Sequence, residues 1–468
     1  MKIIRLSLPC LALLGLFSGS VRGQENTPRS SHDLAYIGHG FRPCKETFPD
    51  SGVYRIICLD LQTRLPCGVC YGAGTEHFHI DTLHNLLWAL NRIHNSFDAV
   101  DLESFSLVRR VPVEPPEIIP EGWNIHQVCY DDARGMAYLR PGSSLCKIDL
   151  TTGSSTRIDS GYYVDCIDLH SSQGKMYIVE HVKGGPIVIV RYDLDSWEKD
   201  TLFFDIEHPV RWFKVSPSGD RMLVICNIWN KEWKGSYELS AETWSLEPEP
   251  LRLDSTGARI PDSSSIHIRY SCLADDLTFM AFNFTGHRKQ YIWNILEPGE
   301  ESLKDFDFLP GWDGPITGYT DISGARRTLL SPGAISVAAI DPYNSEVAIP
   351  PLDPFTGETV RDTFIEDITP KADRADTSVT YYCNCNGPPY HCIINPPEIY
   401  IRGLAAGSGV PPLAGDTNRD GSRNIFDLLE MLQLITDPDP ADYGRGDLDY
   451  NGKVDIFDLL ALLRLLKS

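Results

Sequence analysis

The sequence predicts a mainly β chain that ends in a small all-α module. Three observations lead to this prediction. A polar turn between apolar runs recurs along most of the chain, a second short signature accompanies it, and two Asp-rich loops near the C-terminus each precede an apolar run of helical length. With 468 residues the chain exceeds one typical domain. Its 42% hydrophobic and 23% charged residues are typical of a folded chain.

The chain is strongly acidic. Asp and Glu number 64 against 42 for Lys and Arg, which gives a formal net charge of -22. Such a chain is repelled by nucleic acid and by anionic membranes, and it favours cations. We therefore expect no nucleic-acid partner.

Residues 1–23 have the layout of a secretory signal peptide. Lys2 and Arg5 precede an apolar run from Leu6 to Phe17, and small and polar residues follow up to Gly23. The apolar run is too short for a membrane span, and no later stretch reaches 18 apolar residues. We expect a secreted, extracellular protein without a membrane span, with association to a cell surface left open. Residues 24–35 are polar and are expected to be flexible.

The first repeat is a polar turn between two apolar residues that lie seven positions apart. Its copies begin at Cys129, Leu169, Val215 and Cys272, and an apolar run follows each. A polar turn between two β-rich runs predicts a hairpin. The second apolar residues are Met136, Met176, Met222 and Phe279, so successive copies are 40, 46 and 57 residues apart.

A second signature centres on an acidic residue followed by Leu. Its copies lie at 59–63, 100–104, 148–153, 192–196 and, with Glu, at 237–241. Propeller blades recur every ~40–50 residues with four strands each. We therefore predict a six- or seven-bladed β-propeller over residues 36–403. Two packed β-sandwiches are the alternative, against which the long regular period argues. The turn Ser216-Pro-Ser-Gly219 weakly resembles those of bacterial WD40- and YVTN-like propellers, a resemblance that implies architecture only.

Cysteines cluster at both ends of this region. Cys67 and Cys70, followed by His77 and His79, have the types of a zinc site, with disulfides as the alternative. Because a closed ring brings its ends together, a disulfide to the cluster Cys383, Cys385 and Cys392 is a second hypothesis. We expect Cys129 and Cys272 to be buried thiols. The histidines and the tryptophans are expected to be ordinary strand, turn and core residues. They are His77, His79, His126, His170, Trp88, Trp123, Trp212, Trp229, Trp233 and Trp244.

Two segments near the C-terminus repeat with an offset of 31 residues, after an expected Gly-, Ser- and Pro-containing linker at 404–415. Each carries side chains at positions 1, 3, 5, 7, 9 and 12 of a loop, with Gly at position 6. This is the pattern of the EF-hand calcium loop, in which position 7 ligates through its carbonyl oxygen. The predicted ligands are Asp416, Asn418, Asp420, Ser422, Asn424 and Asp427 for one calcium ion, and Asp447, Asp449, Asn451, Lys453, Asp455 and Asp458 for a second.

The ligand spacing has a physical basis. Calcium takes six to eight oxygens, and a chain that circles the ion presents alternate residues inward. Gly421 and Gly452 permit the sharp bend in mid-loop. Without a cation the crowded carboxylates repel one another, so metal binding and folding are expected to be coupled. Both loops have Asp at position 12, and neither is expected to have a helix before it.

The predicted helices, Ile425 to Ile435 and Ile456 to Leu466, are apolar over more than one face. One face of each can pack on its twin, and the other needs a partner or forms a small exposed patch. Residues 416–468 closely resemble a type I dockerin, a module that docks to cohesin domains of scaffold proteins. The resemblance implies a cohesin-like scaffold or surface protein as partner. It also implies partner contacts at Ile425, Phe426, Leu432, Gln433, Ile456, Phe457, Leu463 and Arg464.

The resemblance leaves two functions open. In the first, the module tethers a propeller that binds a carbohydrate or protein ligand. In the second, the propeller is a glycoside hydrolase that degrades polysaccharide, as the dockerin resemblance implies for many such chains. The sequence assigns no catalytic residue, because no carboxylate pair can be given acid and base roles. A purely structural role for calcium, as a staple of a small module, is a further alternative.

Overall fold

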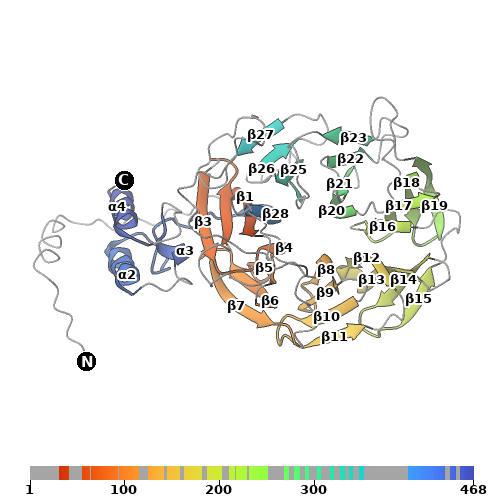
Figure 1. Cartoon of the computed structure of the whole chain (residues 1–468), viewed down its shortest axis with the longest axis horizontal. Coiled ribbons are helices and arrows are strands. Elements are labelled where there is room, and N and C mark those ends of the chain that lie inside the picture. The colour runs from red at the N-terminus through yellow and green to blue at the C-terminus, as the bar shows by residue number, and fades with distance from the viewer. Residues whose placement is uncertain are drawn as a thin grey trace, which may run out of the picture.

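The computed structural model describes most of the chain before residue 251, the strands between residues 268 and 352, and most of the C-terminal part. The longer described stretches are residues 31–41, 55–63, 65–92, 94–114, 125–141, 145–158, 163–181, 187–202, 210–216, 218–228, 231–250, 399–437, 443–448 and 454–467. Within this part, seven antiparallel sheets of four strands are arranged in a ring (Figure 1). The chain is therefore a seven-bladed β-propeller, and the predicted fold class is confirmed.

Six blades are formed by four consecutive strands, and the first strand of each lies nearest the centre of the ring (Figure 1). These blades are β4 (Glu76–Asp81), β5 (Leu86–Asn91), β6 (Ser96–Asp101) and β7 (Ser106–Pro112); β8 (Ile125–Asp131), β9 (Met136–Pro141), β10 (Leu145–Asp149) and β11 (Ser155–Ile158); β12 (Tyr163–His170), β13 (Lys175–His181), β14 (Ile187–Asp193) and β15 (Lys199–Leu202); β16 (Val210–Val215), β17 (Arg221–Ile228), β18 (Lys231–Glu238) and β19 (Thr243–Pro250); β20 (Ile268–Leu273), β21 (Phe279–Phe284), β22 (Gln290–Asn294) and β23 (Leu303–Phe306); and β24 (Thr317–Thr320), β25 (Arg327–Pro332), β26 (Val337–Ile340) and β27 (Val347–Leu352).

The seventh blade closes the ring by joining the two ends of the propeller. Its order is β28 (Ile399–Gly409), β1 (His32–Phe41), β2 (Arg55–Asp60) and β3 (Leu65–Tyr71). Strand β28 pairs with β1 along its whole length, from His32 opposite Gly409 to Phe41 opposite Ile399. The predicted boundaries are corrected here, because residues 32–35 and 404–409 are strand rather than flexible segment and linker. The two cysteine clusters proposed to close the ring cannot be compared, since Cys383, Cys385 and Cys392 lie outside the described residues.

The second sequence signature is a turn between the third and fourth strands of a blade. Its Asp side chain accepts hydrogen bonds from backbone N–H groups two or three residues further on. The distances are 2.8 Å from Gln62 N to Asp60, 2.6 Å from Thr151 N to Asp149 and 2.9 Å from Ser196 N to Asp193. This local bond turns the chain and leaves the following Leu to pack in the core.

The core lies between neighbouring blades. Residues from β5, β6, β9 and β10 form one buried cluster that includes Trp88, Phe97, Leu139 and Ile148. Trp88 and Trp212 are each 5% exposed, as predicted for core residues. Trp123 and Trp229 lie outside the described residues, as does the side chain of Trp233.

Buried charges in the propeller are paired. Asp98 is fully buried and receives two hydrogen bonds from Arg110, at 2.9 and 3.1 Å, and one from Asn91 at 2.7 Å. Between blades, Lys214 donates to Asp168 at 2.8 Å. A buried carboxylate without such partners would be strongly destabilising, so these pairs fix the blades in their order.

The zinc hypothesis is not supported where it can be examined. His79 bonds to Asp132 of the next blade at 2.7 Å and stacks on Tyr130, while Cys67 points to Cys58. Among the described residues no three His, Cys, Asp or Glu side chains form a cluster that could hold a metal ion.

The small C-terminal module lies outside the ring, beside the seventh blade (Figure 1). It contains α2 (Ile425–Thr436), α3 (Tyr443–Gly446) and α4 (Ile456–Leu465). The helices α2 and α4 lie where the sequence predicted them. The single turn α3 was not predicted, and it precedes the second loop, so that loop does follow a short helix. In the part of the chain that the structure describes, no helix is long and apolar enough to cross a membrane.

Candidate functional site

The first Asp-rich loop, residues 416–427, curls around its own acidic side chains. The Asp416 carboxylate accepts hydrogen bonds from the backbone N–H groups of Asp420, at 3.1 Å, and Gly421, at 2.8 Å. Gly421 has φ +82°, and a Cβ added to it would meet no atom within 4 Å, so backbone conformation rather than space requires glycine there. The amide groups of Asn418 and Asn424 both approach Asp420, at 3.1 and 3.3 Å.

The loop gathers negative charge. Burial raises the pKa of Asp416, the Gly421 N–H opposes this, and the nearby negative charges of Asp427 and Asp420 raise the pKa further. Asp427 is itself fully buried. A divalent cation would offset this repulsion, and all of the predicted ligands of this loop are oxygen donors, which suit a hard cation such as Ca²⁺.

The end of each loop is also the start of a helix. Asn424 accepts from Phe426 N at 2.7 Å, and Asp427 accepts from Asn424 N at 2.6 Å, which together make a capping box. In the second copy, Asp455 accepts from Phe457 N and Asp458 accepts from Asp455 N, both at 2.8 Å. The 31-residue offset is thus preserved bond for bond at the two helix starts.

The second loop is described only at its two ends. Asp449, Asn451 and Lys453 lie outside the described residues. At its start, the carboxylate of Asp447 is 1% exposed and accepts a hydrogen bond from the hydroxyl of Tyr71 in β3. At its end, the fully buried Asp458 accepts from Leu448 N at 2.7 Å.

The helices share a small core, and each presents an apolar stripe to solvent. Leu428, Met431, Leu434, Val454 and Leu462 form the core. The exposed stripe of α2 contains Phe426 and Leu429, and that of α4 contains Phe457 and Leu460, at the same offset of 31. Their exposed fractions are 61%, 52%, 65% and 45%, respectively.

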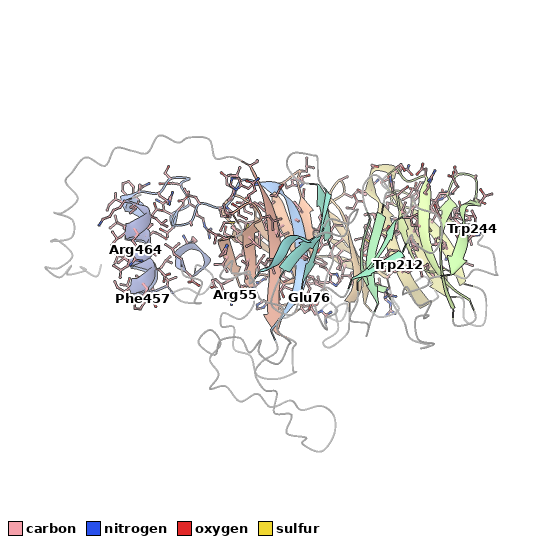
Figure 2. The ribbon with its side chains drawn as sticks, turned by 90° about the horizontal axis from the view of Figure 1, so that it is seen from above. Arg55, Glu76, Trp212, Trp244, Phe457 and Arg464 are labelled. Carbon is pink, nitrogen blue, oxygen red and sulfur yellow. The ribbon has the colours of Figure 1, made fainter. Side chains whose placement is uncertain are left out.

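The predicted partner contacts divide into two groups. Phe426, Leu432, Gln433, Ile456, Phe457 and Arg464 are exposed, whereas Ile425 and Leu463 are partly buried against the core of the module. The sequence prediction missed Leu429 and Leu460. The signal that identifies them is their spacing, because each lies three residues after the exposed Phe of its helix. Figure 2 shows Phe457 and Arg464 on α4, at the end of the molecule farthest from Trp212 and Trp244.

The opposite side of the module contacts the propeller. At Gly444 in α3, a Cβ would collide with the carbonyl oxygen of Val69, and at Gly68 in β3 it would lie 3.1 Å from Pro412. A cleft of about 280 Å³ lies between the two parts, lined by residues of the seventh blade and of both loops. The contact leaves α2 and α4 on the outer side (Figure 1).

Comparison with known proteins adds a general likeness to other propellers. No protein-family model matches the sequence, and no curated protein is significantly similar to it. Among solved structures, a protein from Lactobacillus plantarum is 12% identical with a TM-score of 0.44 and covers 68% of this chain and 95% of its own. The β-propeller domain of Cps50 (Swd1) from Myceliophteria thermophila is 11% identical with a TM-score of 0.41, covering 60% and 86%. Hydrazine synthase of Kuenenia stuttgartiensis is 14% identical, also with a TM-score of 0.41, covering 57% and 76%.

Proposed function

We propose that this chain is a calcium-binding protein whose dockerin-like module docks to a cohesin-like partner and thereby tethers the propeller. The observation that carries the proposal is the internal repeat. Helix caps, buried position-12 carboxylates and exposed apolar stripes all recur with the offset of 31 residues. A calcium staple alone needs the loops, but it does not need a matching exposed Phe on each helix.

The calcium sites use this chain's own oxygen atoms. Asp416, Asn418, Asp420, Asn424 and Asp427, with the carbonyl of Ser422, would hold the first ion. The corresponding residues from Asp447 to Asp458 would hold the second. When bound, calcium supplies the positive charge that these crowded carboxylates lack. The carboxylates of Asp427 and Asp458 then link the ion to the first turn of the helix that follows.

Docking would use the two exposed stripes. Phe426 corresponds to Phe457, Leu429 to Leu460 and Gln433 to Arg464. Two matching stripes on one module offer a partner two binding orientations, related by a pseudo-two-fold axis. The partner should present a shallow apolar surface, because each stripe ends in an exposed aromatic ring.

The propeller would act as the cargo, and we propose a ligand-binding role for it. No specific observation in the described residues favours the hydrolase alternative. Secretion is part of the proposal and rests on the signal-like residues 1–23.

A direct test uses the full-length chain and a panel of immobilised cohesin domains. We expect at least one domain to retain the chain in millimolar calcium and to release it when a chelator is added. Retention that is indifferent to the chelator, or no retention by any cohesin in the panel, would argue against docking.

A further inference from the structure

Two cysteines of the seventh blade lie side by side. Cys58 in β2 is opposite Gly68 of β3, and the next pair is Leu59 opposite Pro66, so Cys67 is the extra residue of a β-bulge. A bulge turns the side chain of its extra residue out of the regular alternation. The result is that the Cys67 Sγ lies 3.3 Å from the Cys58 Sγ.

The two thiols differ in access. Cys58 is fully buried, and burial followed by the hydrogen bond from Cys67 raises the pKa of its thiol well above the usual value. Cys67 is only partly buried and lines the cleft between the blade and the C-terminal module. An oxidant would therefore meet Cys67 first.

We propose that Cys58 and Cys67 form a cross-strand disulfide when the protein meets a disulfide oxidant such as oxidised glutathione. The Cys67 thiolate attacks one sulfur of oxidised glutathione and expels one glutathione thiolate. The Cys58 thiolate then attacks the Cys67 sulfur and expels the second. The two cysteines lose two electrons and two protons, and oxidised glutathione gains them to become two molecules of the thiol.

Peptide mapping of the full-length chain tests this pairing. The chain is incubated with oxidised glutathione, alkylated and digested with trypsin, which cuts after Arg55, Arg64 and Arg92. We expect peptide 56–64 linked to peptide 65–92, two hydrogens lighter than their sum. The link should disappear in Cys67→Ala and persist in Cys70→Ala. Reduction should lower the melting temperature of the oxidised wild type by about 2–5 °C and leave that of Cys67→Ala unchanged.

Two results would overturn the pairing. One is complete alkylation of both Cys58 and Cys67 after oxidation. The other is a link from either residue to a different cysteine, including Cys70 or the cluster Cys383, Cys385 and Cys392.

A separate observation concerns the second loop and rests on the proposed calcium function. Tyr71 is 3% exposed, and its hydroxyl donates to Asp447, the position-1 residue of the loop. Burial, and then the negative charge of Asp447, raise the pKa of Tyr71, so its hydroxyl stays protonated. In the first loop the equivalent carboxylate, Asp416, takes bonds from backbone N–H groups of its own loop.

We infer that Tyr71 positions Asp447 for calcium, so that the propeller takes part in the second site. A hydrogen bond to one carboxylate oxygen fixes the direction of the other, and removal of such an outer partner typically weakens metal binding ~10–100-fold. Tyr71 would not touch the ion itself. The first site has its corresponding bonds within the module.

Calcium titration of full-length Tyr71→Phe by calorimetry tests this role. We expect one of two dissociation constants to rise about tenfold, while the other and the melting temperature of the propeller stay unchanged. Tyr138→Phe is the matched control, since the buried Tyr138 hydroxyl has no hydrogen-bond partner within the part of the chain that the structure describes. Two unchanged constants in Tyr71→Phe would overturn the inference. A wild type that binds no calcium would overturn the proposed function and this inference with it.

Discussion

Chelation of calcium from the full-length chain is expected to unfold the C-terminal module and to leave the propeller folded. Asp427, Asp447 and Asp458 are each no more than 1% exposed, and the shared core of the module has only five fully packed side chains among the described residues. A core of this size rarely holds a fold of some fifty residues without a staple. Each ion at one hundred times its dissociation constant would add about 2.7 kcal/mol of stability.

Hydrogen–deuterium exchange followed by mass spectrometry measures this effect by region. Peptides that cover α2 and α4 should lose protection with the chelator, and peptides from β5, β9 and β13 should keep theirs. The propeller peptides are the internal control, because their sheets form independently of the loops. Unchanged protection of α2 and α4 would show that the module does not need calcium to fold.

Replacement of both exposed Phe residues, Phe426→Ala with Phe457→Ala, is expected to abolish most docking. Each residue is more than 60% exposed, so the substitutions remove partner contacts rather than the core of the module. A central aromatic contact in an interface is typically worth about 2 kcal/mol or more, which corresponds to an affinity loss of about 30-fold.

Each single substitution should cost far less than the pair. If the two orientations bind equally well, loss of one halves the association constant, a change of about 0.4 kcal/mol. Surface plasmon resonance against a captured cohesin domain measures both cases. Leu83→Ala and Val108→Ala are matched controls, since these propeller side chains are 73% and 54% exposed. A single substitution as damaging as the pair would exclude two equivalent orientations.

Much of the propeller could be predicted because its turns are local. Asp60, Asp149 and Asp193 each form their turn with residues two or three positions away, so the sequence period shows the blades directly. Ring closure could not be predicted in the same way. The pairing of β28 with β1 joins the two ends of the propeller sequence, and no local pattern marks residues 404–409 as strand.

The site was predictable to a similar limit. Loop positions and helix starts follow from spacing, and the capping boxes at Asn424 and Asp455 agree with it. Which apolar residues face outward depends on the packing of α2 against α4 and of α3 against β3. For that reason Leu429 and Leu460 were missed, Ile425 and Leu463 proved partly buried, and the contact of Tyr71 with Asp447 had no sequence signal.

The most direct test of the calcium account is a calorimetric titration of the purified, metal-free chain with Ca²⁺. The account predicts two ions bound per chain, with one lost in Asp416→Ala and the other in Asp458→Ala. A titration that releases no binding heat and leaves the helical circular dichroism signal unchanged would contradict it.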